Sequence, residues 1–508
     1  MEDDSLVSAR KIRQPVESKD DIANAFDGIT YEKGAAVIYM FEHWIGPDRF
    51  REGVERYMKR HSYANATASD FLAAVSEAAG RDIAPTFSTF LDQAGVPLVS
   101  VNLKCGEGKT TLALAQKRYL PLGSNAPSKQ TWQIPVCYRY SDSSTERREC
   151  ALLKDLQAEV PVESATSCPA WILLNTDETG YYRTNYEGGL LEKLLVGSGK
   201  QLTPTERIGV IDDAQALVRS GDFPAGEALK LAPRFANDPA RQVVASTVGI
   251  VGGINDHLVP EELRPNYERF IAKIYAERAR RLGWQSKPDE GDETRLLRPV
   301  LVNLVANRGE DKILIDQAKK LAEQWFENRR VVSPDVTGLL LATAASHGNR
   351  ALYDRFISTL KKTTEERERQ WLLQAISSFR QPEMVEANFR LFLSGKVDSR
   401  ESFGLLFGAL NDPRTQTLPY KFVTENYDKI VAALPRSVDT DMSSYLPYAA
   451  GGFCDDDHRA QAEAFFKDRS AKATGGPRIL AQVLESIRQC EATRTAQQLG
   501  ITEFLKNY

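Results

Sequence analysis

The pattern of secondary-structure signals changes twice along the chain, and these two changes constrain the fold more than any other feature. Residues 1–95 carry apolar side chains at helical spacing, and residues 187–508 do so again. Residues 96–186 show instead short runs such as "LVSVNL", "TTLALAQKRYL" and "QTWQIPVCYRY", which polar, turn-prone stretches separate. The sequence therefore predicts a multidomain, mainly helical protein with one β domain in the middle of its chain.

The two outer patterns and the central one predict three domains. Short strands without helices between them are typical of a small β-sandwich, which we expect over residues 96–186. The long succession of amphipathic helices over residues 187–508 shows no strict repeat, and it predicts an irregular α-solenoid with a HEAT- or armadillo-like superhelical form. Three domains also suit a chain of 508 residues, which exceeds what one core usually serves.

Several helix ends are marked by local signals. Thr67 stands three residues before Asp70, and Thr203 stands three residues before Glu206 with Pro204 between them. Both patterns are capping boxes, in which the two side chains bond each other's backbone N–H groups at a helix start. Gly80 predicts the end of the helix that Thr67 begins, since glycine tolerates the positive φ of a helix end.

The charge balance excludes some classes of partner. Lysine and arginine number 65, and aspartate and glutamate number 69, so the chain has no excess of positive charge for nucleic acid or an acidic membrane surface. No apolar run reaches the ~18 residues that a membrane span needs. The polar start "MEDDSLVSARKIRQ" lacks the apolar core of a signal peptide. We expect a soluble protein, cytoplasmic or, if a preceding segment carries a signal, periplasmic or extracellular.

Six cysteines leave two interpretations open. No pair forms a CxxC motif, which argues against a zinc ribbon or a thioredoxin-type site. Disulfides in an oxidising compartment and buried free thiols both fit this number, with a slight preference for disulfides. The cysteines cluster in one stretch of the β region and near the C-terminus: Cys105, Cys137, Cys150, Cys168, Cys454 and Cys490.

No local motif for a metal is present. A helical HExxH motif would place two histidines four residues apart on one face, and none of the histidines has another at that spacing. The segment "CDDDH" at 454–458 looks like a ligand cluster, but we interpret it as a solvated loop or a helix start. We therefore assign no metal ligand in this chain. The histidines are His43, His61, His257, His347 and His458.

Tyr31 is the one candidate catalytic residue. It stands in "TYEKGAAVIYMFEHW", directly before a helix rich in large apolar side chains. Such a tyrosine is usually structural, because its ring packs and its hydroxyl finds a partner. A neutral phenol can also donate a hydrogen bond to a developing oxyanion. Both interpretations of Tyr31 stay open on the local sequence.

Several stretches together resemble the M1 zinc aminopeptidases, the membrane alanyl aminopeptidase or gluzincin family. They are, in chain order, "FDGITYEKGAAVIYMFEHWIG", "FREGVERYMKRHSYANATASDF", "FSTFLDQAGVPLVSV" and "WILLNTDETGYYRTNY". The helical remainder, including "GGPRILAQVLESIRQC", is similar to the C-terminal domain of the endoplasmic-reticulum aminopeptidases. The match is ordered and covers almost the whole chain.

The resemblance implies a role for each part of the chain. Residues 1–95 would be the helical C-terminal part of a thermolysin-like catalytic domain, and Tyr31 would stabilise the tetrahedral intermediate opposite the zinc. The β-sandwich and a helical domain that encloses peptide substrates would follow. The complete family enzyme holds zinc, whereas we assign no cofactor and no substrate-binding residue to this chain.

One departure limits the function. The family's GAMEN-type loop, HExxH motif and third zinc ligand should precede Tyr31, yet only 30 residues stand before it and none of these motifs is among them. We expect the C-terminal part of an M1-type aminopeptidase that is inactive alone, because zinc and its general base carry the chemistry. The alternative is a non-catalytic helical scaffold or peptide-docking module derived from such an enzyme.

A missing half would also leave a surface uncovered. The first long helix places Ala35, Ile38, Phe41 and Trp44 at helical spacing, and we expect these side chains to form an exposed apolar patch. Such a patch would favour self-association through the N-terminal helices and lower the solubility of the chain.

Overall fold

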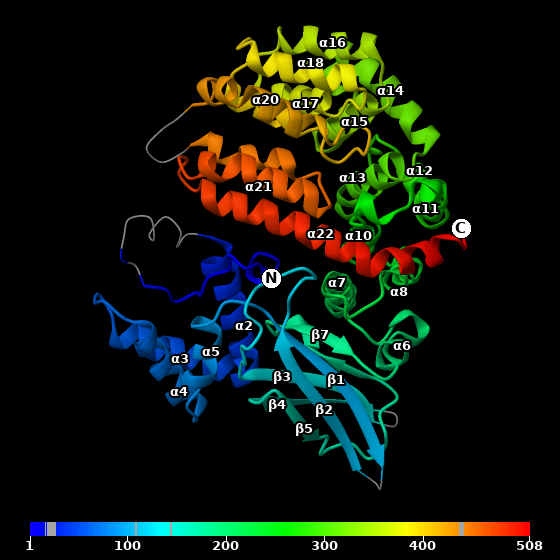
Figure 1. Ribbon diagram of the computed structural model, residues 1–508. Helices are drawn as coiled ribbons and strands as arrows, with labels where there is room; N and C mark the ends of the chain where they lie inside the picture. The colour runs from blue at the N-terminus through cyan, green and yellow to red at the C-terminus, as the bar shows by residue number, and fades with distance from the viewer. Residues whose placement is uncertain (16, 18–26, 107–108, 143–144, 436–440) are drawn as a thin grey trace. The chain divides into compact units, whose positions relative to one another are not determined.

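The computed structural model of the protein describes residues 1–15, 17, 27–106, 109–142, 145–435 and 441–508. These residues form two compact units, an N-terminal unit of Met1–Asp222 and a C-terminal unit of Phe223–Tyr508. Helices dominate both units, and the strands belong to the N-terminal unit (Figure 1). The prediction of a mainly helical chain with a small β region is thereby confirmed at this level.

The first part of the N-terminal unit is helical. Its α4 starts at a capping box, as the sequence predicts, with Thr67 Oγ1 accepting from Asp70 N at 3.3 Å and Asp70 Oδ2 accepting from Thr67 N at 2.8 Å. Gly80 ends α4 in the left-handed region at φ 67°. The elements are η1 (Asp3–Ser5), the π-helix η2 (Ile29–Lys33), α2 (Gly34–Ile45), α3 (Pro47–Arg60), α4 (Ala68–Ala79) and α5 (Ala84–Leu91).

Phe41 shows that the predicted apolar patch was partly wrong. It is fully buried, with its ring centroid 4.3 Å from that of Phe87 and 6.3 Å from that of Phe90 on α5. Trp44 is half-buried, and the guanidinium of Arg81 lies 3.8 Å from its ring centroid. Both side chains face the helices that follow in the chain rather than solvent.

Ala35 and Ile38 are exposed, as the patch prediction requires. The exposed apolar surface of α2 therefore lies about one third of a turn away from the side that Phe41 and Trp44 occupy.

The strands of the described residues form two sheets. One has the order β5-β2-β1-β7, with β1 antiparallel to β2 and parallel to β7, and the other has the order β4-β3-β6. Along β3, Val136, Tyr138 and Tyr140 are buried on one face of the strand, and Arg139 is buried on the other. The strands are β1 (Pro97–Gly106), β2 (Lys109–Arg118), β3 (Ile134–Asp142), β4 (Thr145–Leu153), β5 (Gln157–Pro161), β6 (Ile172–Leu174) and β7 (Arg183–Tyr186).

Helix α7 (Pro204–Ser220), which follows α6 (Leu190–Leu194), is tied to the sheets by its capping residue. Glu206 accepts from Thr203 N at 2.8 Å in the predicted capping box, and it also accepts from Arg139 Nε of β3 at 2.9 Å. Both Glu206 and Arg139 are buried, so the cap and a buried ion pair share one carboxylate. This arrangement fixes the start of α7 against β3.

Two further buried carboxyl groups lie where the turn before β7 meets α7. Burial and the charge of Asp213 raise the pKa of Glu178 well above its usual range. Burial also raises the pKa of Asp213 to about 6, although Arg183 opposes that rise. A carboxyl group whose pKa is raised in this way stabilises the folded state while it is protonated.

The N-terminal unit should consequently lose stability as the pH rises. Unfolded carboxyl groups titrate near pH 4, so the contribution of Asp213 is fully present below that pH and disappears as the pH passes about 6. We expect the unit to be at least about 1 kcal/mol less stable at pH 7.5 than at pH 5. Amide exchange in β7 measures the stability of this unit specifically. Glu178→Gln should make that stability depend less on pH. The exposed Glu192→Gln is the matched control, and an equal effect of both variants would contradict the assignment.

The C-terminal unit is helical throughout its described residues. One of its core clusters includes Phe389, Val423, Phe466 and Ile487, and the rings of Phe389 and Phe422 stack at 4.5 Å. The α-helices are α8 (Ala225–Leu229), α9 (Leu231–Phe235), α10 (Arg241–Gly252), α11 (Arg264–Ile271), α12 (Glu277–Leu282), α13 (Asp292–Asn307), α14 (Lys312–Glu327), α15 (Pro334–Ser346), α16 (Arg350–Leu360), α17 (Glu366–Ser377), α18 (Pro382–Leu393), α19 (Ser399–Ser402), α20 (Leu418–Ala433), α21 (Asp456–Ser470) and α22 (Gly476–Leu505).

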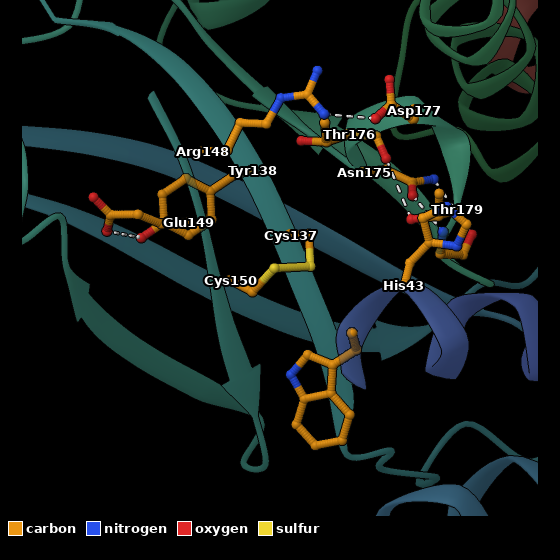
Figure 2. Close-up of a disulfide and its surroundings, with 12 residues drawn as sticks. His43, Cys137, Tyr138, Arg148, Glu149, Cys150, Asn175, Thr176, Asp177 and Thr179 are labelled. Atoms are coloured by element: carbon orange, nitrogen blue, oxygen red, sulfur yellow. Dashed lines mark hydrogen bonds and ion pairs between the residues drawn. A yellow bond between two sulfur atoms is a disulfide. The ribbon is translucent and has the colours of Figure 1, made fainter. Parts of the chain in front are cut away.

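Each of the six cysteines, all of them among the described residues, is in a disulfide. The pairs are Cys105–Cys168, Cys137–Cys150 and Cys454–Cys490. Cys137 and Cys150 are direct partners across the antiparallel strands β3 and β4, next to the Tyr138–Glu149 hydrogen bond of 3.1 Å (Figure 2). The structure thus selects disulfides, the interpretation that the sequence favoured slightly over buried thiols.

Candidate functional site

Tyr31 lies in the middle of the π-helix η2, which leads directly into α2. Its side chain is 61% exposed, whereas Ile29 and Lys33 on either side of it are buried. Short π-helical segments within α-helices are rare and occur often at functional sites. The two buried neighbours hold the segment in the protein while the phenol reaches the surface.

The start of η2 is fixed by Asp27 and Arg10. The carboxylate of Asp27 accepts from Ile29 N at 2.9 Å and from Thr30 N at 3.2 Å, as a capping residue does. Arg10 forms a two-point ion pair with this carboxylate and donates to Thr30 Oγ1 at 2.7 Å. The segment before Tyr31 therefore has little freedom to move away from the N-terminal residues.

The end of η2 is fixed by a buried ion pair. Lys33 Nζ lies 2.8 Å from Asp4 Oδ2, and the side chains of both residues are 1% exposed. Lys33 also donates to the carbonyl of Gln93 at 3.0 Å. Asp4 accepts from Gly95 N at 2.8 Å and from Tyr181 Oη at 3.1 Å. Asp4 thus connects η1, η2, the start of the β region and the turn before β7.

Desolvation makes the Lys33–Asp4 pair a sensitive element. Burial lowers the pKa of the Lys33 ammonium, and the neighbouring Asp4 carboxylate opposes that change. A buried charge is costly without its partner, so the ammonium stays in place because Asp4 and the backbone carbonyls satisfy it. Together with Arg10 and Asp27, the pair clamps the π-helix on both sides of Tyr31.

The surface beside Tyr31 is mainly apolar. Ala35, Ile38 and Tyr39 are exposed on α2, with Ile38 at 41% and Tyr39 at 47% exposure. We call Tyr31 and these three residues the α2 face. Contiguous exposed apolar surface of this kind often marks an interaction site.

The described residues around Tyr31 do not fit a zinc ion. Among the residues that the structure places, one group alone brings three ligand-type side chains together, namely His257, Cys454 and Cys490. That group belongs to the C-terminal unit, and its two sulfur atoms are bonded to each other. The described residues at Tyr31 therefore offer a phenol that can donate a hydrogen bond, and no set of three ligand-type side chains is found among them.

The "CDDDH" segment forms a helix start, which confirms the second of the two structural interpretations offered for it. Asp455 caps α21 by accepting from His458 N at 2.9 Å, and it pairs with His458 Nδ1 at 2.8 Å. Cys454 is bonded to Cys490.

Two family models match the chain. The ERAP1-like C-terminal domain matches residues 171–489, and the Peptidase family M1 domain matches residues 1–90, the segment that contains Tyr31. The chain belongs to the M1 aminopeptidase family. It corresponds to the C-terminal portion of the proteins of that family, as the sequence resemblance indicates.

Curated relatives in the M1 family are similar along nearly the whole chain. Aminopeptidase M1-D of Oryza sativa subsp. japonica is 26% identical over 501 residues, which is 96% of this chain and 56% of the relative. Glutamyl aminopeptidase of Bos taurus is 27% identical over 507 residues, 96% of this chain and 50% of the relative. Aminopeptidase 2 of Candida albicans is 24% identical over 488 residues, 95% of this chain and 52% of the relative. The chain spans about half the length of these relatives.

Sequence reasoning named Tyr31 as a candidate, which stays a prediction, but missed the residues that fix the segment around it. Asp4, Arg10, Asp27 and Lys33 come together only through contacts across η1, η2 and the start of the β region. The one available signal was the charge of Lys33 immediately before a strongly apolar helix of this M1 family member.

The described helices include none that is both long and apolar enough to cross a membrane.

Proposed function

We propose that this chain contributes the C-terminal part of an M1-type zinc aminopeptidase, which removes N-terminal amino acids from peptides. In the proposal Tyr31 donates a hydrogen bond to the oxyanion of the tetrahedral intermediate. The observation that carries it is the exposed phenol on a clamped π-helix, within the segment that matches the M1 domain model. The relatives described above are likewise named as aminopeptidases.

The physical role of Tyr31 follows from its geometry and chemistry. A neutral phenol donates one hydrogen bond at neutral pH, and a donor already in place needs no reorganisation when charge develops. Arg10, Asp27, Lys33 and Asp4 supply that preorganisation by fixing the backbone on both sides of Tyr31. Zinc and its general base would have to come from polypeptide that this sequence does not contain, so no metal-dependent step is derived for these residues.

The α2 face is the proposed contact surface for the metal-binding half. Ile38 and Tyr39 are large apolar side chains that water covers in this chain, and they lie about two helical turns after Tyr31. A partner that brought a zinc site to Tyr31 would have to lie close to this face. Without the partner, the same face would favour self-association of the chain.

The finer features of the fold are part of the proposal. We propose that residues 96–186 form a β-sandwich, that residues 1–95 complete a thermolysin-like catalytic domain, and that residues 187–508 form a superhelical domain that encloses peptides. The two sheets and the unbroken succession of helices after α7 support these assignments. The three disulfides favour an oxidising compartment, where such bonds persist.

Reconstitution tests the proposed function. The chain alone, supplied with zinc, should release no chromophore from aminoacyl substrates above the rate of a metal-only control, because one oxyanion donor lacks a nucleophile and a base. Mixing it with a separately made metal-binding half of a relative should restore turnover. Sedimentation of the same samples should show self-associated chain alone and a one-to-one complex in the mixture. Substantial turnover by the chain alone, or none by a stable complex, would contradict the proposal.

A peptide-docking module is the second candidate, and a cavity in the C-terminal unit favours it. About 540 Å³ of space lies between α17 and α19, lined by Arg369, Gln370, Arg400 and Glu401 among others. Polar and charged groups of this kind suit a peptide with ionised groups. Peptide binding that persists in the chain alone, without any turnover in the mixture, would favour this candidate over the enzyme.

A further inference from the structure

The group His257, Cys454 and Cys490 offers a chemistry that the proposed aminopeptidase does not use. Cys454 follows the 3-10 helix η10 (Met442–Ala450), Cys490 lies in α22, and His257 lies in the short 3-10 helix η5 (Asp256–Leu258). A ring nitrogen of His257 and the two sulfur atoms all lie within 4.8 Å of one another. Cys454 is buried, whereas His257 and Cys490 are partly buried.

The imidazole of His257 is held in one orientation. Its Nε2 lies 2.9 Å from the carbonyl oxygen of Gly452. A carbonyl can only accept, so Nε2 carries the proton and Nδ1 keeps its lone pair in the neutral ring. A metal-binding histidine usually donates its other ring N–H to a carbonyl in this way.

The backbone around His257 is also fixed. Asn255 Oδ1 accepts from His257 N at 2.9 Å, and Gln498 Nε2 of α22 donates to the His257 carbonyl at 3.4 Å. The contact with Gln498 links His257 to the same helix that carries Cys490. The three side chains are therefore brought together by the fold of the C-terminal unit and not by one flexible loop.

Neighbouring side chains are already engaged elsewhere. His458 pairs with Asp455 at 2.8 Å and stacks on Phe453 with ring centroids 4.1 Å apart. Neither His458 nor Asp455 is in the group with ligand atoms close enough to share an ion. A site built on the three residues would leave its fourth position to water.

We propose that reduction of the Cys454–Cys490 disulfide creates a Cys₂His site for Zn²⁺ or a similar thiophilic divalent cation. A dithiol or a phosphine supplies two electrons, the S–S bond breaks, and two thiols form with two protons from solvent. Binding of the cation then releases those two protons, because the thiolate is the ligand. A small-molecule disulfide, by accepting two electrons from the thiolates and leaving as two thiols, restores the S–S bond and expels the cation, so the two states exclude each other.

The dimensions suit this exchange. Zinc binds sulfur at about 2.3 Å and imidazole nitrogen at about 2.0 Å, which places tetrahedral ligand atoms roughly 3.5 Å apart. The sulfur atoms must separate from bonding distance, and the ring nitrogen must approach from within 4.8 Å. The Cα atoms of Cys454 and Cys490 lie 5.1 Å apart, so small side-chain movements suffice.

The other two disulfides provide an internal comparison. Among the residues that the structure describes, neither Cys105–Cys168 nor Cys137–Cys150 lies in a group with a third ligand-type side chain. Their reduced forms offer two thiols without an imidazole. Metal binding should consequently be confined to the His257 site.

Titration of the full chain with Co²⁺ and Zn²⁺ tests the proposal. The chain reduced by a water-soluble phosphine should bind one cation, with the absorption of cobalt–thiolate charge transfer, and the oxidised chain should bind none. His257→Ala should weaken cation binding by more than about 100-fold. That loss exceeds the usual loss when a residue that only orients a metal ligand is removed. Cys137→Ser combined with Cys150→Ser is the matched control and should leave the stoichiometry unchanged.

Circular dichroism of each sample shows whether the C-terminal helices persist after reduction. Loss of helix in the reduced chain would contradict the proposal, because the site depends on the native fold. So would a folded reduced chain that binds no cation, or binding that His257→Ala leaves intact. These outcomes do not depend on aminopeptidase turnover, and the proposed function stands or falls separately.

Discussion

Replacing Tyr31 by phenylalanine in the reconstituted enzyme is expected to lower kcat by about 10²–10³-fold, the usual effect of removing one oxyanion donor. The substitution removes a single oxygen from an exposed ring, so the fold of the π-helix should persist. KM should change little, because the hydrogen bond forms in the transition state and not with the bound substrate. Steady-state kinetics on an aminoacyl chromogenic substrate measure both quantities.

Tyr39→Phe is the matched control for this prediction. Tyr39 is also an exposed tyrosine of the α2 face, with 47% of its surface accessible, and lies two turns further along the helix. Removing its hydroxyl should leave kcat within about twofold of the value for the unsubstituted chain, since no transition-state hydrogen bond is removed. Equal losses in the two variants would mean that the α2 face matters only as a contact surface.

The second large effect is expected at Asp4. Asp4→Asn removes the charge that balances the buried ammonium of Lys33, on which the positive charge of Arg118 also acts. Breaking a buried ion pair on one side typically costs about 3–5 kcal/mol, because the remaining charge is left uncompensated. Urea unfolding of the chain, followed by amide exchange in η2 and α2, should show this loss in the N-terminal unit.

Two comparisons separate the buried charge from a general effect of the substitution. Asp48→Asn breaks an exposed pair with Arg51 at 3.0 Å and should change stability by less than about 1 kcal/mol. Adding Lys33→Met to Asp4→Asn removes the uncompensated charge and should recover part of the lost stability. A destabilisation by Asp4→Asn no larger than that of Asp48→Asn would show that the pair does not anchor η2.

Local signals were sufficient where neighbouring residues determine the structure. The capping boxes at Thr67 and Thr203 predicted the starts of α4 and α7, because each depends on two side chains three residues apart. The change from helical to strand-like spacing near residue 96 likewise agrees with β1 beginning at Pro97. Both signals act within one element, where the sequence contains the interacting groups.

Contacts between distant residues were beyond local sequence reasoning. Phe41 was predicted to be exposed, but its burial depends on Phe87 and Phe90, which approach it only when α5 folds back on α2. Lys33 pairs with Asp4, 29 positions earlier, and neither residue carries a mark of that pairing in the sequence. Six cysteines allow about 15 pairings, so the three disulfides could not be assigned from spacing.

Binding of a tetrahedral phosphinic peptide, an analogue of the transition state, tests the central claim most directly. Calorimetry should detect no binding to the chain alone and tight binding to its complex with the metal-binding half. In that complex Tyr31→Phe should weaken binding of the analogue by the same factor as it lowers kcat, while Tyr39→Phe should not. Tight binding by the chain alone, or unchanged affinity in the Tyr31→Phe complex, would contradict the assignment of Tyr31 as the oxyanion donor of a centre whose metal ligands lie outside this sequence.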